Sequence, residues 1–293
     1  MAHQFDLPSC LNTFLDFKKI PLDSQELEEF LSTIEREVGS MSNFLQALVN
    51  THLWKDWEIN PNPYKEIIIS VGSEIDRLAT LRNEPAYHSK KHMMDVCLML
   101  TYLLKQEKYD RDKLMRSPWE STLQEKWLLL LAAASHDLGH PGLINDSPYQ
   151  LERQSLDLLR ALLNTAQCSS ALMHEIGDAL TPWILATDHA QYAALLKRLA
   201  SQPLSHQDCL AMLLVEADLA SSVLPKRGLE LTNRLCQEWE APYPEKSIAL
   251  RNQVGYLSFL TSLQFVSPQA TCAGIPQILN NSLTQIRTQS HED

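Results

Sequence analysis

Two matched pairs of histidines constrain this chain more than any other feature. His88 and His92 are four residues apart, and so are His136 and His140. Residues four apart on a helix point the same way, so the first pair can direct two imidazoles into one cavity. A single histidine is more often a structural side chain. Four of the chain's ten histidines in two matched pairs favour a metal or catalytic site.

The second pair has an acidic neighbour, Asp137. An apolar helix is predicted over residues 127–134, and it runs toward Gly139 and Gly142, which stop helices. His136 and Asp137 are therefore expected where this helix ends, where neighbouring side chains can turn toward one target. Imidazole and carboxylate groups that converge on a point suit a divalent ion such as zinc, manganese or iron.

A fourth candidate ligand lies in a helix predicted over residues 206–222. Asp218 shares a face with three apolar residues of this helix. A buried carboxylate is costly unless it is paired or bound to a metal. Taken alone, an aspartate bonded to an arginine or a helix terminus is the more common case. With His92, His136 and Asp137 available, metal binding is the better interpretation.

Apolar residues recur at intervals of three and four through most of the chain, and no alternating strand pattern of useful length occurs. The predicted fold class is therefore all-α, a compact multi-helix domain. Residues 1–22 are expected to form a loose arm, with the first helix beginning at Asp23. Further helices are predicted over residues 41–54, 64–82, 88–106, 127–134, 149–164, 170–187, 189–200, 206–222, 228–240 and 247–265, with a polar connection at 111–121 and a tail after 265.

The composition narrows the choice of partner and compartment. The net charge of −11 argues against a nucleic-acid partner or an anionic membrane held by general charge. An anionic substrate therefore needs a local positive centre, which a bound metal supplies. Six cysteines without a C-x-x-C pattern, no signal peptide and no membrane-length apolar run lead us to expect a cytoplasmic protein.

Five short motifs follow one another along the chain. They are Tyr87-His88-x-x-x-His92-x-x-Asp95-Val96, His136-Asp137-x-x-His140-Pro141-Gly142-x-x-Asn145, Ala186-Thr187-Asp188, Ala217-Asp218-Leu219 and Gln253-Val254-Gly255-Tyr256. The order His…His-Asp…Asp is that of the HD superfamily of metal-dependent phosphohydrolases. Over roughly residues 80–265, the five segments together resemble the catalytic domain of class I 3′,5′-cyclic nucleotide phosphodiesterases. The resemblance implies a catalytic core over residues 81–293, with residues 1–80 as an arm and helical cap of one continuous domain.

The resemblance also implies a two-metal site. His92, His136, Asp137 and Asp218 match the ligands of a first metal, usually Zn²⁺, and Asp137 would bridge to a second, usually Mg²⁺ or Mn²⁺. A hydroxide shared by the two metals is then the nucleophile. Four further residues match groups that orient ligands and metal waters: His140, Asn145, Glu152 and Asp188.

By the same resemblance, His88 is the general acid that protonates the leaving 3′ oxygen, and Tyr87 contacts the phosphate. A protonated imidazole needs an anionic partner, and Glu238 matches the family glutamate in that role. An exposed helix glutamate is an equally weighted interpretation of Glu238.

The resemblance further implies that the purine bonds to Gln253 and stacks between Tyr256 and Leu235. Ser221 replaces the usual asparagine, and the segment from Glu238 to Gln253 is much shorter than in the family. Both departures relax the base pocket, so weak discrimination between cAMP and cGMP is expected.

The leading functional prediction is hydrolysis of cAMP or cGMP to the nucleoside 5′-monophosphate, with a small cyclic nucleotide as the only predicted partner. Two alternatives stay open at this point. One is an HD phosphohydrolase that acts on another nucleotide or a cyclic oligonucleotide. The other is a catalytically weak nucleotide-binding module.

Overall fold

The computed structural model describes residues 5–16, 23–107 and 117–289. These ranges contain sixteen α-helices, two short 3₁₀ helices and no strand, which confirms the all-α prediction. The elements are α1 (Leu7–Asp16), α2 (Ser24–Glu37), α3 (Met41–Val49), α4 (His52–Asp56), α5 (Tyr64–Leu81), α6 (Lys90–Lys105), α7 (Leu123–Ser135), α8 (Gln150–Thr165), α9 (Ser170–Leu185), η1 (His189–Gln191), α10 (Tyr192–Leu199), α11 (His206–Ala220), η2 (Ser221–Val223), α12 (Pro225–Trp239), α13 (Pro244–Arg251), α14 (Gln253–Ser262), α15 (Pro268–Ala273) and α16 (Ile275–Gln289).

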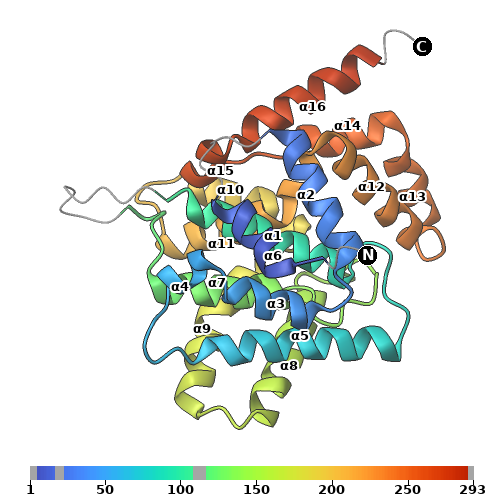
Figure 1. The fold of residues 1–293 in the computed structure, drawn as a ribbon. Coiled ribbons are helices and arrows are strands. Elements are labelled where there is room, and N and C mark those ends of the chain that lie inside the picture. The colour runs from blue at the N-terminus through green and yellow to red at the C-terminus, as the bar shows by residue number, and fades with distance from the viewer. Residues whose placement is uncertain (1–4, 17–22, 108–116, 290–293) are drawn as a thin grey trace.

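Three helices, α6, α7 and α11, form the centre of the molecule (Figure 1). Every residue from His92 to Leu104 in α6 is buried, and so is every residue from Lys126 to Ser135 in α7. A helix that is apolar on all sides must be covered on all sides, so the other helices pack around these three. None of the described helices combines the length and apolarity needed to cross a bilayer.

Two groups of the surrounding helices lie at opposite ends of the centre. Helices α12, α13, α14 and α16 lie together at one end, with α2 beside α12 (Figure 1). Helices α8 and α9 pack against each other at the other end (Figure 1). The catalytic prediction concerns the junction between α12 and the central helices.

The prediction of a loose arm over residues 1–22 is wrong for residues 7–16, which form α1. The ring of Phe14 stacks on that of Phe30, with centroids 3.8 Å apart, and burial of this face stabilises a helix that its sequence alone does not mark. Residues 1–4 and 17–22 lie outside the described ranges. The predicted helix start at Asp23 is confirmed, because its side chain accepts a hydrogen bond from the amide of Gln25 at 2.8 Å.

Two predicted helices have different boundaries in the structure. The helix predicted over 88–106 begins at Lys90, so His88 precedes it and is not on a helix with His92. The helix predicted over 247–265 is divided in two at Asn252, whose side chain caps α14. A capping side chain competes with a continuous helix for the backbone amides, which explains the break.

Two other segments also differ from their predictions, the one over 41–54 and the tail. The helix predicted over 41–54 is two helices, α3 and α4. The tail is helical, because Pro268 and Pro276 stand in the first turns of α15 and α16, where a missing amide hydrogen costs nothing. Of the predicted polar connection at 111–121, residues 111–116 lie outside the described ranges and 117–121 contain no helix.

The buried face of α7 offers a test of this core. Leu130 is fully buried, and we expect Leu130→Ala to lower the free energy of unfolding by about 2–5 kcal/mol because it leaves a cavity. The matched control is Leu81→Ala at a side chain that is 67% exposed, where we expect a change within about 0.5 kcal/mol. Denaturant unfolding measures both, and equal effects would contradict the packing described.

Candidate active site

The three central helices bring four predicted metal ligands to one point. His92 lies in the first turn of α6, and Asp218 lies in the last turn of α11. His136 and Asp137 directly follow α7. Because each helix ends here, its apolar body stays in the core while its polar end faces the site.

The ligand atoms lie close together. His92 Nε2 is 3.0 Å from Asp218 Oδ1, and His136 Nε2 is 3.2 Å from Asp137 Oδ2. The crossed distances are 3.6 Å from His92 to Asp137 and 3.7 Å from His136 to Asp218. One potential ligand atom from each of His92, His136 and Asp218 lies within 4.8 Å of the other two. The structure therefore brings all four side chains together.

The environment of His136 fits a bound cation. Its Nδ1 lies 3.0 Å from the carbonyl oxygen of Ala133, which leaves Nε2 facing the two carboxylates without a hydrogen-bond partner among the described residues. Burial lowers the pKa of His136, but Asp137 and Asp218 outweigh it and raise that pKa well above its usual range. The site therefore attracts a proton or a metal ion at Nε2, and the mixed nitrogen and oxygen donors suit a divalent metal.

The turn after α7 positions the second half of the motif. Gly139 has a φ of 75°, which L side chains rarely adopt, and the amide of His140 donates to the carbonyl of Asp137 at 3.0 Å. The chain thereby reverses and places the ring of His140 against that of His88, with centroids 3.7 Å apart. The rings of His88 and His140, which come from two different motifs, therefore stack on each other, although His88 does not lie in a helix.

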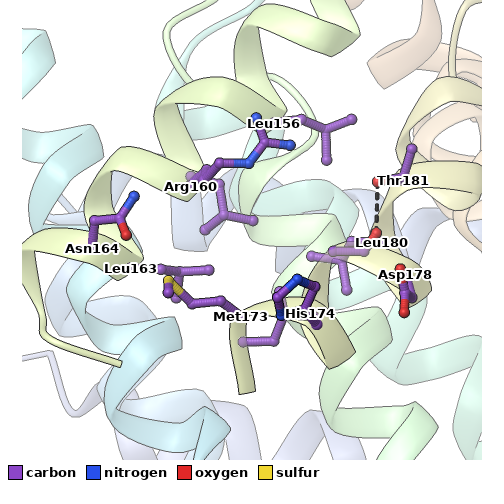
Figure 2. Close-up of a pocket in the computed structure, with 12 residues that line it drawn as sticks. Leu156, Arg160, Leu163, Asn164, Met173, His174, Asp178, Leu180 and Thr181 are labelled. Atoms are coloured by element: carbon purple, nitrogen blue, oxygen red, sulfur yellow. Dashed lines mark hydrogen bonds between the residues drawn. The ribbon is translucent and has the colours of Figure 1, made fainter. Parts of the chain in front are cut away.

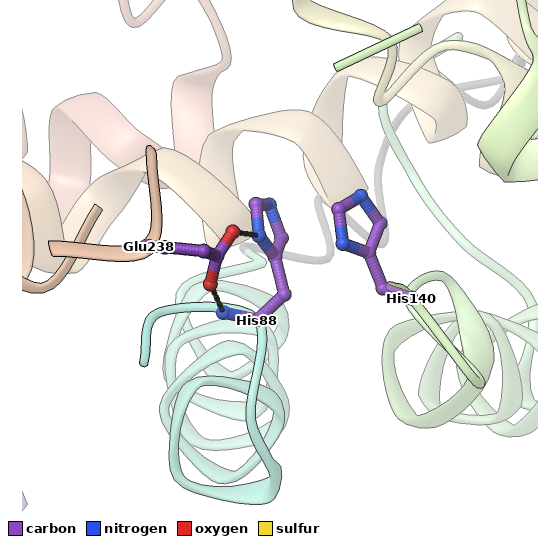
Figure 3. A group of neighbouring side chains, drawn as sticks. All are labelled: His88, His140 and Glu238. Atoms are coloured by element: carbon purple, nitrogen blue, oxygen red, sulfur yellow. Dashed lines mark hydrogen bonds and ion pairs between the residues drawn. The ribbon is translucent and has the colours of Figure 1, made fainter. Parts of the chain in front are cut away.

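Glu238 holds both the ring and the backbone of His88 (Figure 3). One carboxylate oxygen lies 2.5 Å from His88 Nδ1. The other accepts hydrogen bonds from the amides of Tyr87 at 2.9 Å and His88 at 3.1 Å. The Glu238 side chain is only 3% exposed, so the interpretation of an exposed helix glutamate is wrong.

The surroundings shift the pKa values of the two stacked imidazoles in opposite directions. Burial lowers the pKa of His88, but Asp137 and Glu238 raise it above its usual value overall. Burial, together with the charge of His88, lowers the pKa of His140 to about 3. Nδ1 of His140 also accepts a hydrogen bond from the amide of Gly142 at 3.1 Å, so the neutral form of His140 is favoured, whereas the protonated form of His88 is favoured.

The other predicted orienting residues, Asn145, Glu152 and Asp188, are held by hydrogen bonds of their own. Asn145 donates to both carboxylate oxygens of Glu152, at 3.2 and 3.0 Å. Burial raises the pKa of Glu152, and the nearby charges of Asp188 and Asp137 add to that rise. Asp188 also accepts from the amide of Tyr149 at 3.0 Å. Glu152 therefore lies close enough to Asp188 and to the predicted ligand Asp137 for their charges to affect its pKa.

Tyr87 lies against the same cluster. Its ring centroid is 4.6 Å from that of His92, a predicted ligand, and 4.8 Å from that of His88. Burial, with the charges of Asp218 and Asp137, raises the pKa of Tyr87 well above its usual value. The phenol is therefore neutral and can donate a hydrogen bond near the predicted metal ligands.

The predicted purine contacts are not assembled beside the predicted metal ligands. Gln253 is exposed, and its Nε2 donates to the carbonyl of Ile286 at 3.1 Å. Gln253 and Tyr256 line a groove of about 770 Å³ between α2, α12, α14 and α16. Neither Leu235 nor any of the four predicted metal ligands lines that groove.

The short segment before Gln253 explains this separation. Residues 244–251 form α13, which packs on α12 and is tied to it by a 2.6 Å hydrogen bond from Ser247 Oγ to the carbonyl of Cys236. Helix α14 follows after a single residue and packs on α13 and α16. Leu235 stays half-buried on α12 and is not brought to Gln253.

A second groove, of about 390 Å³, lies between α8 and α9 (Figure 2). Arg160 and Asn164 line it from α8, and Met173 and His174 line it from α9. It contains none of the predicted site residues.

Asp95 belongs to the first sequence motif, but the sequence alone assigns no role to this residue. In the structure it is 2% exposed and paired with Arg227, one turn along α6 from His92. A carboxylate on an otherwise apolar stripe, the signal that pointed to Asp218, is present at Asp95 as well.

A metal analysis tests the ligand cluster. We expect Asp218→Ala to lose bound divalent metal, because the remaining imidazoles lack one of the two carboxylates that face them. The control is Asp157→Ala, at an exposed aspartate of α8, which should retain the metal content of the unaltered chain. Elemental analysis of the purified proteins measures both, and full metal retention in Asp218→Ala would remove Asp218 from the ligand set.

Comparison with known proteins agrees with this geometry. No curated protein matches the chain. A solved structure of Leishmania LmjPDEB1 in complex with IBMX has a similar fold, with a TM-score of 0.66 at 18% identity over 90% of this chain and 91% of that chain. The sequence profile of the family described as 3′5′-cyclic nucleotide phosphodiesterase matches residues 87–247, more than half of the chain. The chain therefore belongs to the 3′,5′-cyclic nucleotide phosphodiesterase family.

Proposed function

We propose that this chain hydrolyses cAMP or cGMP to the nucleoside 5′-monophosphate. The observation that carries the proposal is the position of His88 and Glu238 beside the four-residue ligand cluster. A proton donor held by a buried carboxylate next to a metal cluster is what cleavage of a phosphodiester requires. Membership of the family supports the same reaction class.

His92, His136, Asp137 and Asp218 are proposed to hold a first divalent ion, Zn²⁺, with Asp137 shared with a second, Mg²⁺ or Mn²⁺. When bound, such ions lower the pKa of water to make it a nucleophile at neutral pH and neutralise phosphate charge. The residues proposed to orient the ligands and the surrounding water are His140, Asn145, Glu152 and Asp188.

His88 is proposed to donate its proton to the leaving 3′ oxygen. Glu238 stabilises the protonated imidazole and also binds the backbone amide of the same residue, so it sets both the charge and the direction of the ring. The neutral ring of His140 covers the other face of His88 and adds no competing charge. Tyr87 is proposed to contact the phosphate from beside His92.

Gln253, Tyr256 and Leu235 are proposed to contact the purine. Because these three side chains do not share a groove, we expect them to contribute little to selectivity between bases. The same observation favours a second candidate, in which the site accepts another nucleotide or a cyclic oligonucleotide. Hydrolysis of a nucleotide panel by the purified protein, with products identified, distinguishes the two.

The general acid is tested by His88→Ala. We expect kcat for cyclic nucleotide hydrolysis to fall by about 10²–10⁴-fold, because the 3′ alkoxide leaves poorly without a proton. Hydrolysis of bis(4-nitrophenyl) phosphate should fall much less, since nitrophenolate leaves unprotonated, and the metal content should be unchanged. His174→Ala, at an exposed histidine of α9, is the control. Metal loss equal to that of Asp218→Ala would identify His88 as a ligand instead.

Base selectivity is tested by kcat/KM for cAMP and cGMP. We expect the two values to lie within about tenfold of each other, equivalent to ~1.4 kcal/mol. The reason is that Gln253 is exposed, so water can satisfy its amide when the wrong base is bound. A preference of about a hundredfold would show that buried groups read the base.

A further inference from the structure

A buried ionic cluster joins three helices next to the site, and no step of the proposed reaction uses it. Arg227, in the first turn of α12, is 2% exposed. Its Nε and Nη2 both donate to Asp95 Oδ2, at 3.0 and 2.8 Å. Asp95 is also 2% exposed and lies three residues after the ligand His92 on α6. This contact therefore ties the start of α12 to the part of α6 that carries a metal ligand.

Helix α2 completes the cluster through Glu35. Arg227 Nη1 donates to one carboxylate oxygen of Glu35. The other oxygen accepts from Arg234 at 2.5 Å and from Lys91 at 3.1 Å. Burial opposes ionisation of Glu35, but its hydrogen bonds with Arg234 and Arg227 outweigh it and lower the pKa to about 2. Glu35 is thus an anion that holds α12 and α6 at once.

A second acid of α2 holds the same end of α12. Glu28 accepts hydrogen bonds from the amides of Lys226, at 2.5 Å, and Arg227, at 2.9 Å. These amides have no partner within α12, and a carboxylate at a helix N-terminus is favourable. Both the backbone and the side chain of Arg227 are therefore fixed by α2.

The other end of α12 carries Glu238. It lies eleven residues after Arg227, which is about 16 Å along a helix. His88 lies just before α6. A rotation or shift of α12 relative to α6 would change the 2.5 Å contact between Glu238 and His88, while the metal ligands, which come from α6, α7 and α11, would stay in place.

We propose that Arg227 is a positioning residue for the general acid, because it fixes α12 against α6 and α2 and so holds Glu238 in register with His88. The proposal rests on the proposed function of His88 as the acid. A buried ion pair adds little net stability compared with apolar packing, but it can specify one arrangement of helices. The planar guanidinium binds Asp95 of α6 and Glu35 of α2 at once, and its Nη1 also donates to Glu230 of α12 at 3.3 Å. A lysine ammonium does not reproduce these contacts in the same geometry.

Two variants test the proposal, both with the full chain and its metal. Arg227→Lys keeps the positive charge but removes the planar guanidinium that binds Asp95 and Glu35 at once. Glu35→Gln keeps Arg227 and its contact with Asp95 while it weakens the link to α2, and it carries the test if Arg227→Lys does not fold. Arg160→Lys, at an exposed arginine of α8, is the matched control.

We expect kcat for the cyclic nucleotide to fall by about tenfold or more in both variants, because a small misplacement of the acid is costly, with no comparable rise in KM. Hydrolysis of bis(4-nitrophenyl) phosphate and the metal content should match those of the unaltered chain. Loss of both activities in equal proportion, or loss of metal, would show that the cluster only stabilises the fold. An unchanged kcat in both variants would also overturn the proposal.

A spectroscopic readout separates this proposal from the proposed function. In protein labelled with ¹⁵N-histidine, the His88 Nδ1 proton in its short contact with Glu238 should give a downfield NMR signal, assigned by its absence in Glu238→Gln. We expect the signal to shift or vanish in Arg227→Lys and Glu35→Gln, but not in Arg160→Lys. If the unaltered chain hydrolyses no cyclic nucleotide, the proposed function fails while this measurement still decides the role of Arg227. An unmoved signal would refute that role.

Discussion

The structure depends on the neutralisation of carboxylates at the ends of apolar helices. Asp137 and Asp218 stand where α7 and α11 leave the core, and an isolated buried charge of this kind is prohibitively costly. His92 and His136 face these two carboxylates at 3.0 to 3.7 Å, and together the four side chains form a donor set for a divalent ion. Because these four side chains lie at helix ends, the helix bodies can stay apolar and the core stays continuous.

The need to neutralise buried charge also explains why the two stacked imidazoles have different pKa values. Two cationic rings 3.7 Å apart would repel, so the carboxylate of Glu238 determines which one is charged. His88, which contacts Glu238, keeps a raised pKa, and His140 has its pKa lowered to about 3. Farther from the metal ligands, Asp95 and Arg227 repeat the arrangement of a buried acid with one dominant cation. Asp95 of α6 thus pairs with Arg227 of α12, and Glu238 of α12 pairs with His88, which directly precedes α6.

The C-terminal helices place the expected base contacts away from this charge network. Residues 244–251 form α13 against α12, so Gln253 begins a helix that packs beside α16. Its side-chain amide donates a hydrogen bond to a backbone carbonyl of α16. The predicted metal ligands His92 and His136 are buried, whereas Gln253 is exposed, and this difference in enclosure is the physical basis for the weak base selectivity that we propose.

The sequence by itself determined the all-α class, most helix positions and the set of side chains that converge at the site. This is possible because the 3.6-residue period and helix-stop residues are local signals, and because carboxylates on apolar stripes stand out. Only the tertiary structure decided that residues 7–16 are helical, since Phe14 stacks on a ring from α2. It also decided that His88 precedes its helix and that Glu238 is buried, because that contact joins residues 150 apart in the chain. Long-range packing of this kind, which also separates Gln253 from Leu235, leaves no periodic trace in the sequence.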